Sequence, residues 1–216
     1  MSSRVLAADW PAPPNIKAGT TLRDGGESDL PGTPIWIRQV HGNRAVELGS
    51  ADFAPGVPEA DAIIGRRPGD LCVVQTADCL PVLLCSADGQ EVAAVHAGWR
   101  GLAAGVIEAA VSRFVCAPAG ILAWIGPAIS QSAFEVGDEV RQQFGSLGAG
   151  PSALFVANQR GRWQANLAGL AEARMRAIGM RSIYSANVCT YGDAARCYSY
   201  RRDGQTGRHL SFIYRT

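Results

Sequence analysis

The sequence predicts an α/β fold, a single layered domain in which packed central sheets are flanked by helices. Short apolar segments recur along the chain, and each is bounded by Gly, Pro, Asp or Asn, as strands between turns are. Many of these segments are apolar at both odd and even positions, so both faces of their sheets should be covered. Apolar residues at helical spacing lie between some of them.

The expected elements follow from these patterns. The expected strands are residues 34–40, 61–65, 71–76, 80–86, 91–96, 121–126, 182–188 and 208–215. A helix is expected over 100–114, a second one with Asn166 as its N-cap, and a short third one near Asp138. The two glycines of "RRDGQTGR", residues 201–208, predict the connection of a hairpin.

Length and composition predict one domain with a sizeable core. The chain has 216 residues, of which 47% are hydrophobic, and it contains no internal repeat, low-complexity tract or dividing linker. We therefore expect one domain over 1–216, in which residues 1–19 form a weakly ordered segment.

Charge and cysteine content narrow the class of partner. The 20 basic and 19 acidic residues leave a net charge of +1 without runs of one sign, which argues against nucleic acid. No apolar stretch approaches the ~20 residues that span a bilayer. The six cysteines lack the dense spacing of a secreted scaffold. We expect a cytoplasmic protein that is monomeric by default and binds neither nucleic acid nor a membrane.

Three residues suggest a metal site. His41 in "RQVHG" and His96 in "VHAGWRG" each end an expected strand just before a glycine-containing turn, and Cys79 lies in "QTADCLPVLL". A lone histidine or cysteine of this kind is more often structural, and Cys72 and Cys85 are interpreted as buried thiols. Together, however, two imidazoles and a thiolate suit a Zn²⁺ ion whose fourth position stays open for water or substrate.

Other polar residues are candidates for the same pocket. Asp78 would orient a histidine ligand, act as a general acid or base, or cap its own turn. Arg100 would offer a guanidinium to an anion. Gln39 shares the strand parity of His41, and Arg201 flanks the expected hairpin. Weaker candidates of the same kinds are Thr76, Asp61, Arg202 and Arg208.

The chain resembles the YfiH-like family, also labelled polyphenol oxidase or laccase-domain proteins. Five motifs carry the resemblance in the family's order, namely "RQVHG", "QTADCLPVLL", "VAAVHAGWRGLAAGVIE", "WIGPAISQSAFEVGDEV" and "YSYRRDGQTGRHLSFIY". The resemblance runs from about Thr20 to the C-terminus. It implies a layered α/β fold and assigns the family's zinc ligands to His41, Cys79 and His96. The family usually has a longer segment before the first of these ligands than this chain has.

The resemblance also implies an enzyme that acts on a small-molecule substrate. Family members are described as purine nucleoside phosphorylases that split adenosine, inosine, guanosine and methylthioadenosine, and that deaminate adenosine to inosine. They are described as a peptidoglycan editing factor too.

Two other interpretations use the same residues. One is an amidase that edits peptidoglycan precursors, and the other is a metal-free cysteine hydrolase with Cys79 as nucleophile and His96 as base. A non-catalytic metal-binding module would bind zinc without turnover. Copper oxidation of phenols is rejected, because a multicopper centre needs more than the three histidines present.

Overall fold

The computed structural model describes residues 4–51, 53, 56–145 and 152–216. The strands are β1 Val5–Ala7, β2 Ile16–Thr21, β3 Ala45–Glu47, β4 Ala62–Gly65, β5 Cys72–Thr76, β6 Leu80–Ser86, β7 Val92–Ala97, β8 Ile121–Ile125, β9 Glu135–Val136, β10 Phe155–Ala157, β11 Trp163–Ala165, β12 Ser182–Ser185 and β13 His209–Arg215. The α-helices are α1 Trp99–Ala103, α2 Val106–Val111, α3 Asp138–Gln143, α4 Leu167–Ala177 and α5 Tyr200–Asp203. Short 3₁₀ turns cover Glu27–Asp29, Pro118–Gly120 and Ser152–Leu154.

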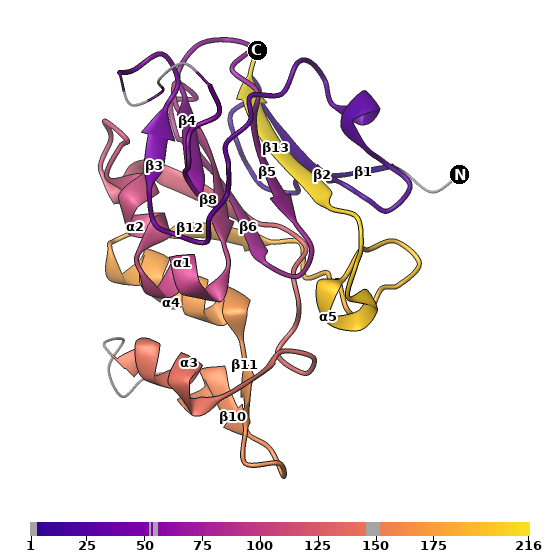
Figure 1. Cartoon of the computed structure of the whole chain (residues 1–216). Helices are drawn as coiled ribbons and strands as arrows, with labels where there is room; N and C mark the ends of the chain where they lie inside the picture. The colour runs from indigo at the N-terminus through magenta and orange to yellow at the C-terminus, as the bar shows by residue number, and fades with distance from the viewer. Residues whose placement is uncertain (1–3, 52, 54–55, 146–151) are drawn as a thin grey trace.

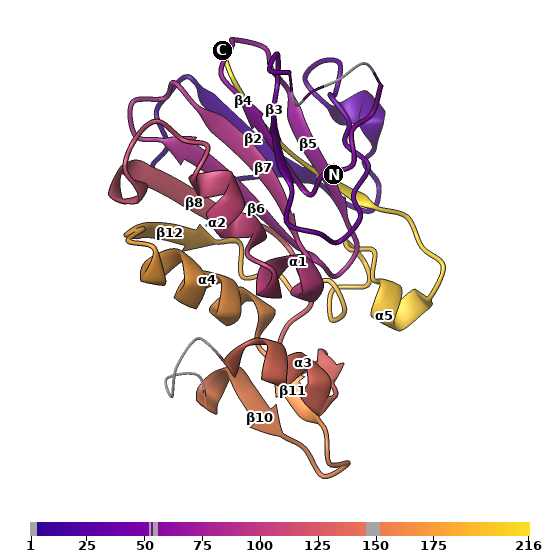
Figure 2. The same ribbon diagram turned by 60° about the vertical axis from the view of Figure 1, so that its left-hand side comes forward.

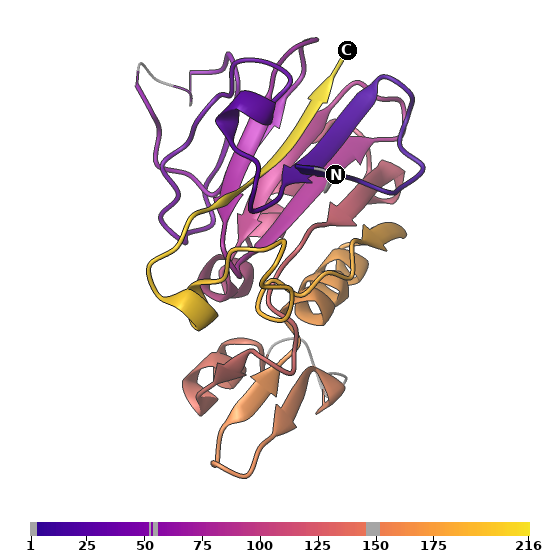
Figure 3. The same cartoon turned by 90° about the vertical axis from the view of Figure 1, so that its right-hand side faces the viewer.

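The main body has three layers, which confirms the predicted α/β layered fold (Figure 1). A six-stranded sheet in the order β12-β8-β6-β7-β4-β3 forms the middle layer. Helices α1, α2 and α4 cover one of its faces, as Figure 2 shows. A four-stranded sheet in the order β1-β2-β13-β5 covers the other face (Figure 3).

Burial on both faces explains the continuous apolar runs in the sequence. In β6, Val82 and Leu84 pack into the core beneath the helices, whereas Leu83 and Cys85 pack into the core between the two sheets. All four side chains have no exposed surface. Because successive side chains of a strand point to opposite faces, a strand in the middle layer must be apolar at every position.

A smaller sheet lies to one side of the three layers. It contains β9, β10 and β11 in the order β10-β11-β9, and α3 packs beside it (Figure 1). The expected helix near Asp138 is α3, and the expected N-cap of α4 is confirmed because the Asn166 Oδ1 accepts a hydrogen bond of 2.9 Å from the Gly169 amide. None of the described helices is long and apolar enough to cross a membrane.

The expected helix over 100–114 is wrong in one respect, since it is broken into α1 and α2. Gly105 separates the two helices with a φ of +89°, a left-handed conformation that ends α1 and starts α2 in a new direction. The apolar spacing continues across the break, so periodicity alone did not reveal it.

The expected strand over 34–40 is also wrong, because only two isolated bridges form there, at Ile35 and Arg38. At Gln39, the side-chain amide forms the hydrogen bonds with β5 that a backbone ladder would otherwise supply. Its amide nitrogen donates to the Gln75 carbonyl at 2.8 Å, and its oxygen accepts from the Gln75 amide at 2.7 Å. A side-chain amide thus attaches this segment to β5.

Two further expectations need correction at the chain ends. A weakly ordered segment is expected over 1–19, of which residues 1–3 lie outside the described part of the chain. Residues 4–19 contain β1 and most of β2, because β2 pairs with β1 on one side and β13 on the other. Residues 201–208 do not connect a hairpin. Ser199 caps α5 there by accepting a hydrogen bond of 3.2 Å from the Arg202 amide, and β13 pairs with β2 and β5 instead.

The left-handed break between α1 and α2 generates a stability prediction. We expect Gly105→Ala to lower the free energy of unfolding by about 1–2 kcal/mol, because an L side chain is disfavoured in this region. Gly26→Ala is the matched control, since Gly26 has an extended φ of −163° and open space around it. Chemical denaturation measures the free energy of unfolding of both variants. Equal values for the two would contradict the role of Gly105.

Candidate metal centre

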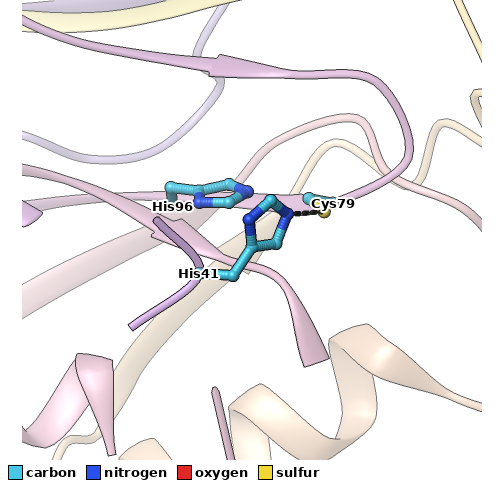
Figure 4. Close-up of side chains that lie close together, drawn as sticks. All are labelled: His41, Cys79 and His96. Carbon is cyan, nitrogen blue, oxygen red and sulfur yellow. Dashed lines mark hydrogen bonds between the residues drawn. The ribbon is translucent and has the colours of Figure 1, made fainter. Parts of the chain in front are cut away.

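His41, Cys79 and His96 converge at one point of the structure (Figure 4). Their ligand atoms all lie within 4.8 Å of one another, and the Cys79 Sγ is 4.0 Å from the His41 Nε2. The two imidazole rings meet edge to face, with centroids 4.8 Å apart and an interplanar angle of 83°. Among the described residues, this is the one group of His, Cys, Asp or Glu that could hold a metal ion.

Sheet pairing brings Cys79 to His96. Strands β6 and β7 are antiparallel neighbours in which Pro81 lies opposite His96 and Leu80 opposite Ala97. Cys79 directly precedes β6, so its thiol lies beside the end of β7. His41 comes from a different region, the turn after the segment that Gln39 attaches to β5.

Asp61 connects the two histidines. Its Oδ1 accepts a hydrogen bond of 2.8 Å from the His96 Nδ1 and one of 3.0 Å from the His41 backbone amide. Its Oδ2 accepts from the Gly42 amide at 2.7 Å and the Val40 amide at 3.2 Å. The carboxylate has no exposed surface. With Nδ1 engaged in this way, His96 presents Nε2 to the other two ligands.

Two glycines allow the close packing around these ligands. A Cβ added at Gly98 would lie 3.1 Å from the Cys79 Sγ and 3.2 Å from the His41 Cδ2. A Cβ at Gly101 would lie 2.6 Å from the Gly42 carbonyl oxygen, so a side chain there would push α1 away from the His41 turn. The glycines of "HAGWRG" therefore bring the start of α1 against the site.

Electrostatics favour the thiolate of Cys79. Burial by itself raises the pKa of this thiol, but hydrogen bonds from His41 and His96 outweigh burial and lower the pKa to about 6. Burial opposes the charged form of His96 too, yet the contacts with Asp61 and Cys79 raise its pKa to about 9. A thiolate is the form of cysteine that binds metals.

The donor set fits zinc. A thiolate and two imidazoles are ligands that Zn²⁺ prefers, and Zn–S and Zn–N bonds of about 2.3 and 2.1 Å place S and N roughly 3.6 Å apart in a tetrahedron. The 4.0 Å between Cys79 Sγ and His41 Nε2 is close to that separation. Three protein ligands would leave one position of a tetrahedral ion for water or substrate.

The three ligands form part of the wall of a cavity of about 560 Å³. It is lined by Ile37, Gln39, His41, Gln75, Thr76, Ala77, Asp78, Cys79, His96, Trp99, Arg100, Ile129, Phe134, Leu167, Tyr200, Arg201 and Arg208. Three arginines and three large aromatic side chains thus share the cavity with the candidate metal ligands. Such a mixture of cationic and aromatic groups suits a ligand with an anionic part and a flat ring.

The predicted residues Arg100, Arg201 and Gln39 all line this cavity, and each also contacts another group of the protein. The guanidinium of Arg100 lies 4.5 Å from the ring centroid of Trp99, and that of Arg201 lies 5.5 Å from the ring centroid of Phe134. Gln39 lines the cavity, although both ends of its amide bind the Gln75 backbone.

Asp78 lines the cavity but does not contact a histidine ring, because its carboxylate binds Thr190, Ser199 and the Arg201 amide. The residue that orients His96 is Asp61, which the sequence indicated only weakly. In the sequence, the signal for this role is the position of Asp61 as the first residue of the otherwise apolar expected strand 61–65.

Arg202 and His209 do not belong to the cavity lining. The Arg202 guanidinium binds the Thr190, Tyr191 and Cys197 carbonyl oxygens. The His209 ring donates from Nδ1 to the Thr21 carbonyl oxygen at 2.7 Å and accepts at Nε2 from the Tyr198 amide at 2.9 Å. Burial lowers the pKa of His209, so this histidine is a neutral structural residue.

Comparison with known proteins identifies relatives along nearly the whole chain. Residues 23–216 match the family model described as multi-copper polyphenol oxidoreductase laccase. The chain is 41% identical to the purine nucleoside phosphorylase YfiH of Shigella flexneri, over 98% of this chain and 99% of that relative. It is 39% identical to the purine nucleoside phosphorylase PA4543 of Pseudomonas aeruginosa, over 97% of each chain.

Solved structures share the fold. The Neisseria meningitidis protein NMB0706 superimposes with a TM-score of 0.90 at 34% identity, over 99% of each chain. YlmD of Geobacillus stearothermophilus gives a TM-score of 0.87 at 27% identity, over 100% of this chain and 97% of that one. The alignment with the Shigella relative runs over 244 positions, whereas this chain has 216 residues, so that relative has segments which this chain lacks.

The contacts of Asp61 generate a prediction about metal affinity. We expect Asp61→Asn to weaken zinc binding roughly 10–100-fold, because the neutral amide orients His96 less strongly and loses part of its attraction for the His41 turn. Competition with a chromophoric chelator measures the affinity, and circular dichroism reports whether the variant is folded. A folded variant with unchanged zinc affinity would show that Asp61 does not support the ligands.

The electrostatics of Cys79 generate a prediction about pH. In metal-free protein, the rate of Cys79 alkylation by iodoacetamide should rise with a midpoint near pH 6, well below the ordinary thiol value of 9.0, because only the thiolate reacts. Peptide mass spectrometry at a series of pH values measures the rate. Buried Cys72, whose pKa burial raises, should stay unmodified over this range. A midpoint above pH 8 for Cys79 would contradict the stabilised thiolate.

Proposed function

This chain belongs to the family described as multi-copper polyphenol oxidoreductase laccase, and we propose that it is a zinc-dependent purine nucleoside phosphorylase. The relatives named purine nucleoside phosphorylases support the proposed activity. The proposed substrates are adenosine, inosine, guanosine and methylthioadenosine, which phosphate splits into the base and a sugar 1-phosphate. Deamination of adenosine to inosine is proposed at the same site. The observation that carries the proposal is the His41, Cys79 and His96 group in the wall of a cavity rich in arginine and aromatic residues.

The arginines supply what phosphorolysis requires. Phosphate must approach the sugar carbon that bears the base, and its negative charge must be held in place while the glycosidic bond breaks. Arg100, Arg201 and Arg208 line the cavity, and a guanidinium offers phosphate a planar fork of permanently charged donors. Stacking on Trp99 aligns the Arg100 guanidinium before phosphate arrives.

Other lining groups suit the nucleoside. The aromatic faces of Trp99, Phe134 and Tyr200 provide surfaces for a purine ring. Thr76 lines the cavity, and its buried hydroxyl has no hydrogen-bond partner within the described part of the chain. A buried hydroxyl without a partner is costly, so we assign Thr76 to a hydrogen bond with the substrate.

The metal ligands account for the proposed deamination. His41, Cys79 and His96 would hold zinc, and a zinc ion with an open position supplies Lewis acidity that makes water a nucleophile near neutral pH. The protein's own contribution is to keep Cys79 ionised and His96 oriented through Asp61. All six cysteines are free thiols, which agrees with the cytoplasmic location that we propose.

The decisive experiment incubates zinc-loaded protein with adenosine, with and without phosphate, and separates the products by chromatography. We expect adenine and ribose 1-phosphate only when phosphate is present, and inosine in both samples. Cys79→Ala should lose stoichiometric zinc and at least ~100-fold of both activities, because one of three ligands is missing. Cys116→Ala, at a half-buried thiol outside the cavity lining, is the matched control and should keep both.

Three results would contradict the proposal in different ways. If metal-free protein retained full turnover, and if iodoacetamide abolished that turnover, the result would favour a cysteine hydrolase with Cys79 as nucleophile and His96 as base. Turnover of a peptidoglycan precursor without any turnover of nucleosides would favour the editing amidase. Stoichiometric zinc without turnover of either substrate would leave a metal-binding module.

A further inference from the structure

Within the described part of the chain, the donors that bind the carboxylate of Asp78 come from the C-terminal arm, which we define as residues 190–203. Its Oδ1 accepts a hydrogen bond of 2.6 Å from the Thr190 hydroxyl. Its Oδ2 accepts one of 3.0 Å from the Ser199 hydroxyl and one of 2.7 Å from the Arg201 backbone amide. Thr190 and Ser199 have no exposed surface, and Asp78 is 9% exposed. Three donors on one nearly buried carboxylate make a strong attachment.

Asp78 lies at a sharp turn beside the candidate metal centre. Its φ of +85° is left-handed, a conformation that aspartate and asparagine tolerate better than most residues. The turn lets Asp78 extend to the C-terminal arm while the adjacent Cys79 extends to His41 and His96. The Asp78 carbonyl oxygen also accepts a hydrogen bond of 3.1 Å from the Ile129 amide.

The C-terminal arm carries two residues of the cavity wall, Tyr200 and Arg201. Within the arm, the Arg202 guanidinium donates to the Thr190 and Cys197 carbonyl oxygens, at 2.9 and 2.8 Å. These bonds hold the two ends of the arm together, so an attachment at Thr190 and Ser199 fixes α5 as well. In Figure 1, α5 lies below the start of β13, at the end of the sheets where the turn between β5 and β6 also lies.

The Arg201 side chain reaches away from Asp78 to the smaller sheet. Its Nη1 donates to the Glu135 carbonyl oxygen at 3.0 Å, and its guanidinium lies 5.5 Å from the Phe134 ring centroid. The backbone of Arg201 is therefore held by Asp78, and its side chain is held by the chain around Phe134. Loss of the Asp78 contact would remove the backbone attachment of Arg201 and leave only that of its side chain.

We propose that Asp78 is a positioning residue that fixes the C-terminal arm to the turn carrying Cys79, and thereby places Arg201 and Tyr200 for substrate binding. This inference rests on the proposed phosphorylase function for its substrate, because Arg201 is one of the proposed phosphate-binding residues. It assigns Asp78 no proton transfer, since both carboxylate oxygens are engaged by the arm.

A positioning role and an acid–base role predict different kinetics. A displaced arm weakens ground-state binding, so the KM for phosphate should rise while kcat changes little. A general acid or base acts in the transition state, so its removal should lower kcat by at least ~100-fold. A variant of the donors, rather than of the carboxylate, separates the two roles, because it loosens the arm and leaves any proton-transfer group intact.

The experiment compares Asp78→Asn with Thr190→Val in full-length, zinc-loaded protein. Asparagine keeps the shape and tolerates the left-handed turn, and valine replaces the buried threonine at nearly equal volume. We expect Asp78→Asn to raise the KM for inorganic phosphate ~10-fold and Thr190→Val ~3-fold, with zinc content unchanged and kcat within ~3-fold of the original. Amide hydrogen exchange in peptides covering 198–204 should accelerate in both variants.

Asp88→Asn is the matched control for Asp78→Asn. Asp88 also accepts hydrogen bonds from a hydroxyl and an amide, those of Ser86 and Gln90, but it lies in the turn between β6 and β7 and outside the cavity lining. It should change neither the KM for phosphate nor the exchange of the arm.

Two results would overturn the proposal. One is a collapse of kcat in Asp78→Asn while Thr190→Val stays normal, which would assign proton transfer to Asp78. The other is unchanged exchange over 198–204 in both variants. Hydrogen exchange needs no substrate, so it tests the attachment of the arm even if the protein proves to have no phosphorylase activity.

Discussion

The candidate site depends on the hydrogen bonds of one buried carboxylate, that of Asp61, with the His96 ring and the backbone amides of the His41 turn. An ionised group without exposed surface is costly unless donors surround it, and the chain satisfies this one with four. The same bonds fix two of the candidate metal ligands, His41 and His96, which lie far apart in the sequence. Asp61 directly precedes β4, which pairs with β7, so the carboxylate belongs to the sheet that carries His96. The His41 turn is thus positioned by the rigid middle layer although it belongs to no strand.

Backbone strain is concentrated at the same place. Among the described residues, three that are not glycine have positive φ, and two of them are His41 at +59° and Asp78 at +85°. Such conformations persist only where the surroundings enforce them, and they cluster at functional sites. Here Asp61 enforces the turn at His41, and the C-terminal arm enforces the turn at Asp78. Each turn gives neighbouring side chains directions other than the two opposite faces that the strict alternation of a regular strand would impose.

Sequence patterns predicted the parts of the fold that depend on local burial and capping. The apolar runs around Val82 and Leu84 predicted two covered faces, and Asn166 predicted the start of α4. The break at Gly105 and the pairing of Gln39 with β5 depend on tertiary contacts, which periodicity does not record. The convergence of His41, Cys79 and His96 was predictable from residue type and motif, whereas the hydrogen bonds that surround these side chains were not. The partners of Asp61 and Asp78 come from segments that only the fold brings together.

The chemistry of the donors favours a mononuclear zinc site over the multicopper centre that the family description names. A multicopper centre requires many more imidazoles than the three histidines of this chain. One of the three, His209, is already saturated, because its ring nitrogens bind the Thr21 carbonyl and the Tyr198 amide inside the core. Two imidazoles therefore remain, with one thiolate, and these donors suit one tetrahedral ion of zinc. The cavity beside them is lined by three arginines, whose positive charge complements the negative charge of phosphate. The residues of the cavity therefore agree better with the proposed phosphorylase activity than with the oxidase that the family description names.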